Sequence, residues 1–125
     1  MAKVLLLEPD RRLAASAQTY LGQAGHQVAT YVDLQAAITA ADTQPPDIVI
    51  TNLILAGRSA SEFLYELRSY PDWQRLPVII LSHLPAGELD GYLPALRQLG
   101  VSRCLQKADT SLQQLADEID YQLKP

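Results

Sequence analysis

Residues 46–52 read Pro-Asp-Ile-Val-Ile-Thr-Asn, a short apolar run that begins after a proline and ends on two polar residues. Two further runs share this character, being β-branched or Leu-rich without polar alternation: Val4–Leu7 and Val78–Leu81. Such runs are typical of strands buried on both faces of a sheet. Weaker strand candidates are Gln27–Tyr31 and Arg103–Gln106.

Amphipathic helices are predicted between these strands. Asp10 and Asp33 stand where a side chain can cap the first and second helices, and Pro45-Pro46 ends the second. For the later helices the capping candidates are pairs: Ser59 or Ser61 for the third, Thr110 or Ser111 for the last. Apolar residues of the first helix recur at helical spacing, namely Leu13, Ala17, Tyr20, Leu21 and Ala24.

The segment from residue 83 to residue 100 is the least regular. It contains Pro85, Gly87, Gly91 and Pro94. Because proline inside a helix removes a hydrogen bond, the sequence predicts a loop followed by a short helix at Pro94–Leu99, with Pro94 in its first turn.

Five strands alternating with five helices predict an α/β fold, a doubly wound parallel sheet covered on both faces. Right-handed crossovers favour the flavodoxin-like strand order 2-1-3-4-5. We expect residues 1–125 to form one domain, since this length is common for one. Ligands of such sheets bind beyond the carboxyl ends of the strands. The residues expected there are Glu8, Pro9, Asp10, Asn52, Ser82, His83, Lys107 and Ala108.

Composition excludes several classes of function. The chain carries a net charge of −4, so it has no long-range attraction for nucleic acid or anionic lipid. No apolar run approaches the length that crosses a bilayer, and the run after Met1-Ala2-Lys3 is too short for a signal peptide, which predicts a cytoplasmic location. Cys104 is the one cysteine, so no intrachain disulfide can form.

Four stretches, in order and at matching spacing, resemble a response-regulator receiver domain of bacterial two-component signalling: residues 3–10, 46–57, 76–82 and 100–107. Receivers carry an acidic pair after the first strand, a phospho-acceptor aspartate after the third, a Ser or Thr after the fourth and a lysine after the fifth. The acceptor carboxylate acts as nucleophile, the carboxylates hold Mg²⁺, and the metal and lysine offset charge on the phosphoryl group.

Carried over by position, the resemblance is partial. Glu8 matches the first acidic position, Ser82 the hydroxyl and Lys107 the lysine, while Pro9 replaces the second acid and Asn52 the acceptor. Proline offers no side-chain ligand and an amide is not a competent acceptor, so we expect no catalytic residue, no cofactor and weak or absent Mg²⁺ binding. Asp10 is expected to cap the helix. Further departures are Ala56 and Ala108 in place of prolines, Ser59-Ala60 in place of Asp-Gly, and Cys104 at the aromatic switch position.

Structural roles compete with functional ones at these positions. Asn52 could hold a loop, Ser82 could cap the one that follows, and Cys104 could be a small apolar filler. Lys107 could be solvated, or could turn inward to Glu8 or Asn52 in a near-surface contact worth under about 1 kcal/mol.

The resemblance implies a non-enzymatic receiver-like module that acts by protein–protein contacts without phosphorylation. Its partner would be a signalling protein or a second copy of the chain, with no nucleic acid or membrane bound. Alternatives are a phospho-accepting regulator that uses an unusual residue, and a flavodoxin-like enzyme, although the turn after the first strand has no glycine to cradle phosphate. The expected interface joins the fourth helix, fifth strand and fifth helix through Arg97, Arg103, Asp117, Asp120 and Tyr121.

Overall fold

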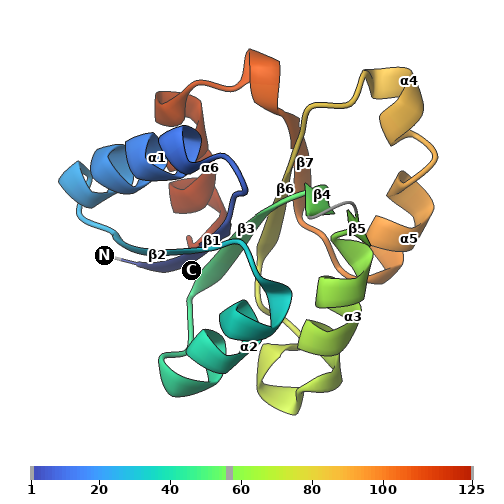
Figure 1. Ribbon diagram of the computed structural model, residues 1–125, viewed down its shortest axis with the longest axis horizontal. Helices are drawn as coiled ribbons and strands as arrows, with labels where there is room; N and C mark the ends of the chain where they lie inside the picture. Colours follow the sequence, from blue (N-terminus) through green and yellow to red (C-terminus); the bar gives the residue numbers. More distant parts are fainter. Residues whose placement is uncertain (1, 56–57, 125) are drawn as a thin grey trace.

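The computed structural model describes residues 2–55 and 58–124, so Ala56 and Gly57 lie outside the described residues. A five-stranded parallel sheet runs through the middle of the molecule (Figure 1), in the order β2-β1-β3-β6-β7. Its strands are β1 (Lys3–Leu7), β2 (Gln27–Tyr31), β3 (Ile48–Asn52), β6 (Val78–Ser82) and β7 (Arg103–Gln106). This is the predicted flavodoxin-like arrangement, with strands at the predicted places.

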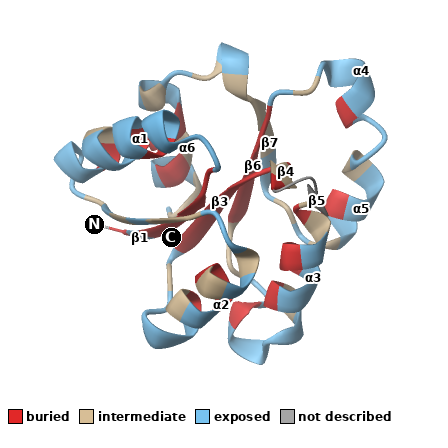
Figure 2. Ribbon diagram, viewed as in Figure 1, coloured by how far each residue is buried: buried red, intermediate tan, exposed pale blue. Residues whose placement is uncertain are grey.

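Helices cover both faces of the sheet (Figure 1). One apolar core lies under α1 (Arg11–Gln23) and α6 (Leu112–Gln122). The other lies under α2 (Leu34–Thr43), α3 (Ser61–Ser69), α4 (Ala86–Leu89) and α5 (Leu93–Gln98). Figure 2 shows buried residues concentrated along the central strands. Within the described residues, no helix combines the length and the apolar character that a bilayer crossing needs.

The predicted helix caps are confirmed in part. The carboxylate of Asp10 accepts from the backbone N–H groups of Arg12 and Leu13, and Asp33 caps α2 in the same way. Ser111 forms a capping box with Gln114 at the start of α6. The third cap was predicted wrongly, because Ala60 precedes α3 and no side chain caps it.

Two residues predicted on the apolar face of the first helix depart from prediction: Ala24 is exposed just past the end of α1, and Leu13 is also exposed. Leu13 is 44% exposed, and the neighbouring Ala14 is buried instead. The predicted spacing was one residue out of phase at the start of α1.

A β-hairpin and a short helix, among other elements, were not predicted. A short antiparallel hairpin joins β4 (Ile54–Leu55) to β5 (Arg58–Ser59) after β3. The predicted loop before α5 contains α4, so the described residues form six α-helices where five were expected. Pro85 stands just before α4, and its fixed φ suits the start of a single helical turn. α5 begins with proline in its first turn, as predicted.

Candidate functional site

The ends of β1, β3 and β6 bring three polar side chains into the interior. Leu7 pairs with Thr51 in the parallel register. The next residues along the chain, Glu8 and Asn52, therefore lie side by side at the ends of β1 and β3. Glu8, Asn52 and Ser82 are 3%, 2% and 1% exposed. Buried polar groups are costly unless they are hydrogen-bonded, so their partners determine what this site can do.

Lys107 enters the site from the end of β7. Its ammonium lies 2.6 Å from Oε1 of Glu8 and donates to Oδ1 of Asn52 at 2.7 Å. The inward orientation of Lys107 is therefore confirmed, and it meets both candidate acceptors. The near-surface description was wrong, because the side chains of Lys107 and Glu8 are only 22% and 3% exposed. Removing one partner of such a buried pair leaves an uncompensated charge, at a typical cost of about 3–5 kcal/mol.

Glu8 and Asn52 each make one further hydrogen bond. Oε2 of Glu8 accepts from the backbone N–H of Asp10 at 3.0 Å. Nδ2 of Asn52 donates to the carbonyl oxygen of Leu7 at 3.1 Å. The amide of Asn52 is thus fixed in one orientation, with its oxygen toward the lysine and its nitrogen toward a carbonyl. An ionised aspartate has no donor to offer that carbonyl.

Of the other residues expected at the strand ends, Asp10 and Ser82 make local contacts, while His83 and Ala108 are exposed. The carboxylate of Asp10 is occupied in capping α1, and Pro9 is exposed. Oγ of Ser82 accepts from the backbone N–H of Leu84 at 3.0 Å, which is the predicted loop-capping contact. Across the part of the chain that the structure describes, no three His, Cys, Asp or Glu side chains are grouped as a metal ion requires.

Gln106 is a contact residue that sequence reasoning missed. Its side-chain oxygen accepts from the N–H of Ala86 at 3.1 Å, and its side-chain nitrogen donates to Asp109 at 3.2 Å. The oxygen and nitrogen are assigned from these partners. Gln106 therefore ties the first turn of α4 to the end of β7, beside Lys107. Its signal in the sequence is only its place next to the lysine.

Cys104, at the predicted switch position, is half-buried against the core below α3 and α5. Burial raises the pKa of its thiol, and the nearby Arg97 guanidinium acts in the opposite direction. These surroundings match those of a small apolar filler.

The five predicted interface residues are exposed, and two of them pair with residues that were not selected. Arg103 pairs with Glu118 at 3.6 Å, an acid that the sequence analysis did not select. Oδ1 of Asp120 lies 3.4 Å from Nε2 of His26, the residue just before β2, so this acid is directed toward β2 and not toward β7. Tyr121, at 66% exposure, is the large apolar side chain of this surface.

The doubly wound sheet, with a lysine reaching across to the polar ends of β1 and β3, defines the receiver class of α/β domain. The family model of the response regulator receiver domain matches residues 4–120, and the chain belongs to that family. Receiver domains are signalling modules rather than typical enzymes.

Relatives and solved structures agree with this assignment. RcaC of Microchaete diplosiphon is 34% identical over 82 residues, 66% of this chain and 13% of RcaC. The KDP operon transcriptional regulatory protein KdpE of Escherichia coli is 33% identical over 82 residues, 66% of this chain and 35% of KdpE. The chain spans well under half the length of the curated relatives it matches.

Among solved structures, the chemotaxis protein CheY4 of Vibrio cholerae superposes with a TM-score of 0.87 at 21% identity, covering 98% of this chain and 99% of CheY4. The N-terminal receiver domain of Klebsiella pneumoniae RstA gives a TM-score of 0.79 at 21% identity, covering 98% and 99%. At this identity the likeness establishes the fold.

Proposed function

We propose that this chain is a receiver module that signals by protein–protein contacts and does not accept a phosphoryl group at Asn52. The observation that carries the proposal is the orientation of the Asn52 amide, held between Lys107 and the Leu7 carbonyl. An amide oxygen is a poor nucleophile toward phosphorus, and this one is engaged by an ammonium.

The donor set also argues against Mg²⁺, a hard cation that takes oxygen ligands in near-octahedral geometry. Both oxygens of Glu8 already have partners, Pro9 supplies none, and the Asn52 oxygen accepts from Lys107. The residues present therefore do not fit the metal site of the family. The lysine ammonium supplies the positive charge, and we expect the amide resonances of Glu8 and Asn52 to stay unchanged when millimolar Mg²⁺ is added.

Without that chemistry, the surface formed by α5, β7 and α6 would be held in one state and would serve as a constant docking face. Exposed Arg97 and Tyr121 are its anchors, since Arg and Tyr dominate the binding energy of many interfaces. Its partner would be a protein of a signalling pathway, met in the cytoplasm.

Intact-mass measurement tests the first part of the proposal. The protein is incubated with Mg²⁺ and a small-molecule phosphodonor, beside a variant carrying both Pro9→Asp and Asn52→Asp. We expect no mass gain in the natural chain, and a gain of one base-labile phosphoryl group in the double variant. A stoichiometric gain in the natural chain would overturn the proposal.

Partner binding tests the second part. Tyr121→Ala combined with Arg97→Glu should weaken capture of the native-host partner and leave the thermal melt nearly unchanged. A surface-exposed double change elsewhere, Tyr65→Ala with Arg75→Glu, is the control. The assignment fails if the α5–β7–α6 variant binds its partner as the natural chain does.

A further inference from the structure

β2 is an edge strand, and the backbone groups of two of its five residues face outward. The N–H of Gln27 donates to Ala2, and the carbonyl of Tyr31 accepts from Glu8, so these residues face β1. In a parallel ladder the backbone groups of alternate residues point to opposite sides. The N–H and C=O groups of Val28 and Thr30 therefore point away from the sheet, toward the open edge (Figure 1).

This edge carries little of the protection that edge strands normally have. Natural edges are blunted by charges, prolines or bulges, whereas Val28, Ala29 and Thr30 supply none of these. A side chain that covers part of this edge is that of Gln18 in α1, whose amide donates to the carbonyl of Val28 at 2.9 Å. One side-chain amide can be displaced by a backbone N–H at little net cost, because one hydrogen bond replaces another.

The segment that contains the edge strand carries little charge of its own, although Lys3 and Arg11 line hollows beside β2. The chain has 10 Lys or Arg and 14 Asp or Glu residues, yet between Leu13 and Ala41 the one charged residue of these types is Asp33. That carboxylate caps α2. Depletion of charge is the compositional mark of the centre of an interface. Two exposed apolar side chains, Leu13 at 44% and Val32 at 53%, lie in the same stretch.

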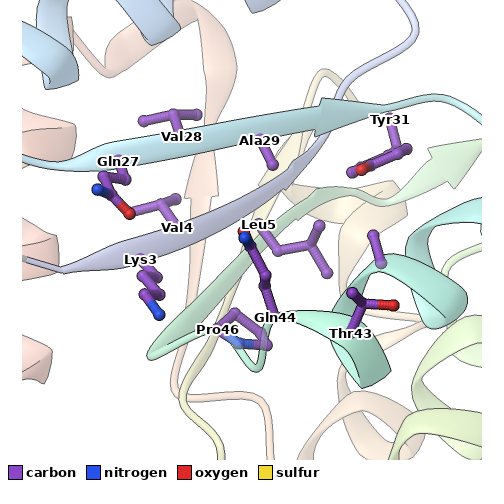
Figure 3. A pocket seen from close by; sticks show the side chains of 11 residues that line it. Lys3, Val4, Leu5, Gln27, Val28, Ala29, Tyr31, Thr43, Gln44 and Pro46 are labelled. Atoms are coloured by element: carbon purple, nitrogen blue, oxygen red, sulfur yellow. The ribbon is translucent and has the colours of Figure 1, made fainter.

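A cavity of about 370 Å³ opens the α2 side of the strand. Figure 3 shows Ala29 and Tyr31 of β2 facing this hollow, with Thr43 of α2 and Gln44, which follows the helix, across it. Val4 and Leu5 of β1 line this cavity as well, so it lies on the face of the sheet beside β2 and not beyond the open edge.

We propose that β2 pairs antiparallel with β2 of a second copy of this chain, about a two-fold axis at Ala29. Val28 of each copy would exchange both backbone hydrogen bonds with Thr30 of the other, after the Gln18 amide leaves the Val28 carbonyl. The register is self-complementary, as a two-fold contact requires. It joins the two five-stranded sheets edge to edge.

The outward backbone groups select the second copy as the occupant, because Val28 and Thr30 of one copy match Thr30 and Val28 of the other. Each copy carries a net charge of −4, so a contact between copies is favoured where acids are few. Asp33 is the one Asp or Glu between Leu13 and Ala41. This contact lies at the opposite edge of the sheet from β7 and is independent of the docking face proposed above.

Sedimentation equilibrium over a range of concentrations tests the inference, with two charge variants as a matched pair. Ala29→Glu places two carboxylates against each other at the two-fold axis, whereas Ala95→Glu adds the same charge to exposed α5. We expect a concentration-dependent dimer whose dissociation constant rises at least about tenfold in Ala29→Glu and is unchanged in Ala95→Glu, since apposed like charges oppose association strongly.

Two further variants change the backbone donor of Thr30 and the side chain of Gln18. Thr30→Pro removes an outward N–H, leaves the β1 bonds intact and should give a monomer. Gln18→Ala frees the Val28 carbonyl and should tighten the dimer. A natural chain that stays monomeric at millimolar concentration overturns the inference, and so does a dimer that survives both Ala29→Glu and Thr30→Pro. A dimer lost in Ala95→Glu instead would place self-association on the α5–β7–α6 face, which overturns this inference alone.

Discussion

The carboxyl end of the sheet and the β2 edge differ in whether the protein itself supplies hydrogen-bond partners for their polar groups. At the sheet end, Glu8, Asn52 and Lys107 satisfy one another and the adjacent backbone inside the protein. At the edge, Val28 and Thr30 hold backbone groups toward solvent, with one carbonyl covered by a side chain. The end where this fold usually binds ligands is closed by its own residues, while the uncharged edge retains bonding capacity.

This difference shows why a family resemblance and a local chemical description must be kept apart. The fold places polar residues at the strand ends of any receiver, but their reactivity depends on which partners the chain itself supplies. Here one ammonium satisfies two acceptors that would otherwise need a cation or water. The predictions below test how firmly that end is closed.

The largest expected effect follows removal of the ammonium. Lys107→Met leaves the carboxylate of Glu8 buried without a cation, and should lower the free energy of unfolding by about 3 kcal/mol. Urea denaturation measures the change. Adding Glu8→Gln should recover part of the loss, because the buried charge is then gone. A Lys107→Met variant within about 0.5 kcal/mol of the natural chain would mean that the pair is a surface contact after all.

The second prediction concerns the orientation of the Asn52 amide. Asn52→Asp places a carboxylate oxygen where Nδ2 now donates to the Leu7 carbonyl, and should cost about 1–2 kcal/mol despite the nearby ammonium. The same change in the Lys107→Met background should cost more, since no cation then offsets the new charge. Urea denaturation of the four chains completes the cycle. An Asn52→Asp chain more stable than the natural one would show that the donor is dispensable.

The third prediction concerns the link between α4 and the buried polar cluster at the carboxyl end of the sheet. Gln106→Ala removes the acceptor for the N–H of Ala86 and should loosen α4, with a cost of about 1 kcal/mol. Hydrogen exchange at Ala86 and its neighbours should accelerate while exchange in α1 stays unchanged. Gln98→Ala, on the exposed side of α5, is the control. Unchanged exchange in α4 would separate this helix from the pocket.

The sequence predicted the sheet well because its signals are local. Apolar runs mark the strands, Asp10 and Asp33 mark helix starts, and alternation of the two element types leaves few topologies. The burial of Glu8 was not predicted, because it depends on Lys107 arriving from almost a hundred residues away. Gln106 and Glu118 were missed because their contacts with Ala86 and Arg103 are set by packing between elements and not by a local sequence pattern. α4 was missed because a single turn leaves no helical periodicity to read.

The smallest expected effect is a pH dependence at Cys104, on the edge strand opposite β2. Burial raises the pKa of this thiol in the folded protein, so the folded state keeps the proton to a higher pH than the unfolded state does. The stabilisation is complete below the ordinary thiol pKa and is lost as the pH rises through the folded value. Between pH 7 and about pH 9.5, the natural chain should therefore lose slightly more stability than Cys104→Ala, which has no thiol to titrate.

A second comparison tests the effect of Arg97 on the ionisation of Cys104. Its guanidinium favours the thiolate and partly offsets the effect of burial, so Arg97→Gln should widen the difference in pH dependence between chains with and without the Cys104 thiol. Urea denaturation at the two pH values measures each chain, and alkylation rates report the thiolate directly. Parallel losses in all chains would mean that Cys104 is as solvated as a free thiol. A smaller loss in the natural chain would mean that Arg97 lowers the pKa of the thiol more than burial raises it. The ionisation of this residue on β7 would then be set mainly by a neighbouring charge, whereas β2 carries no ionisable thiol.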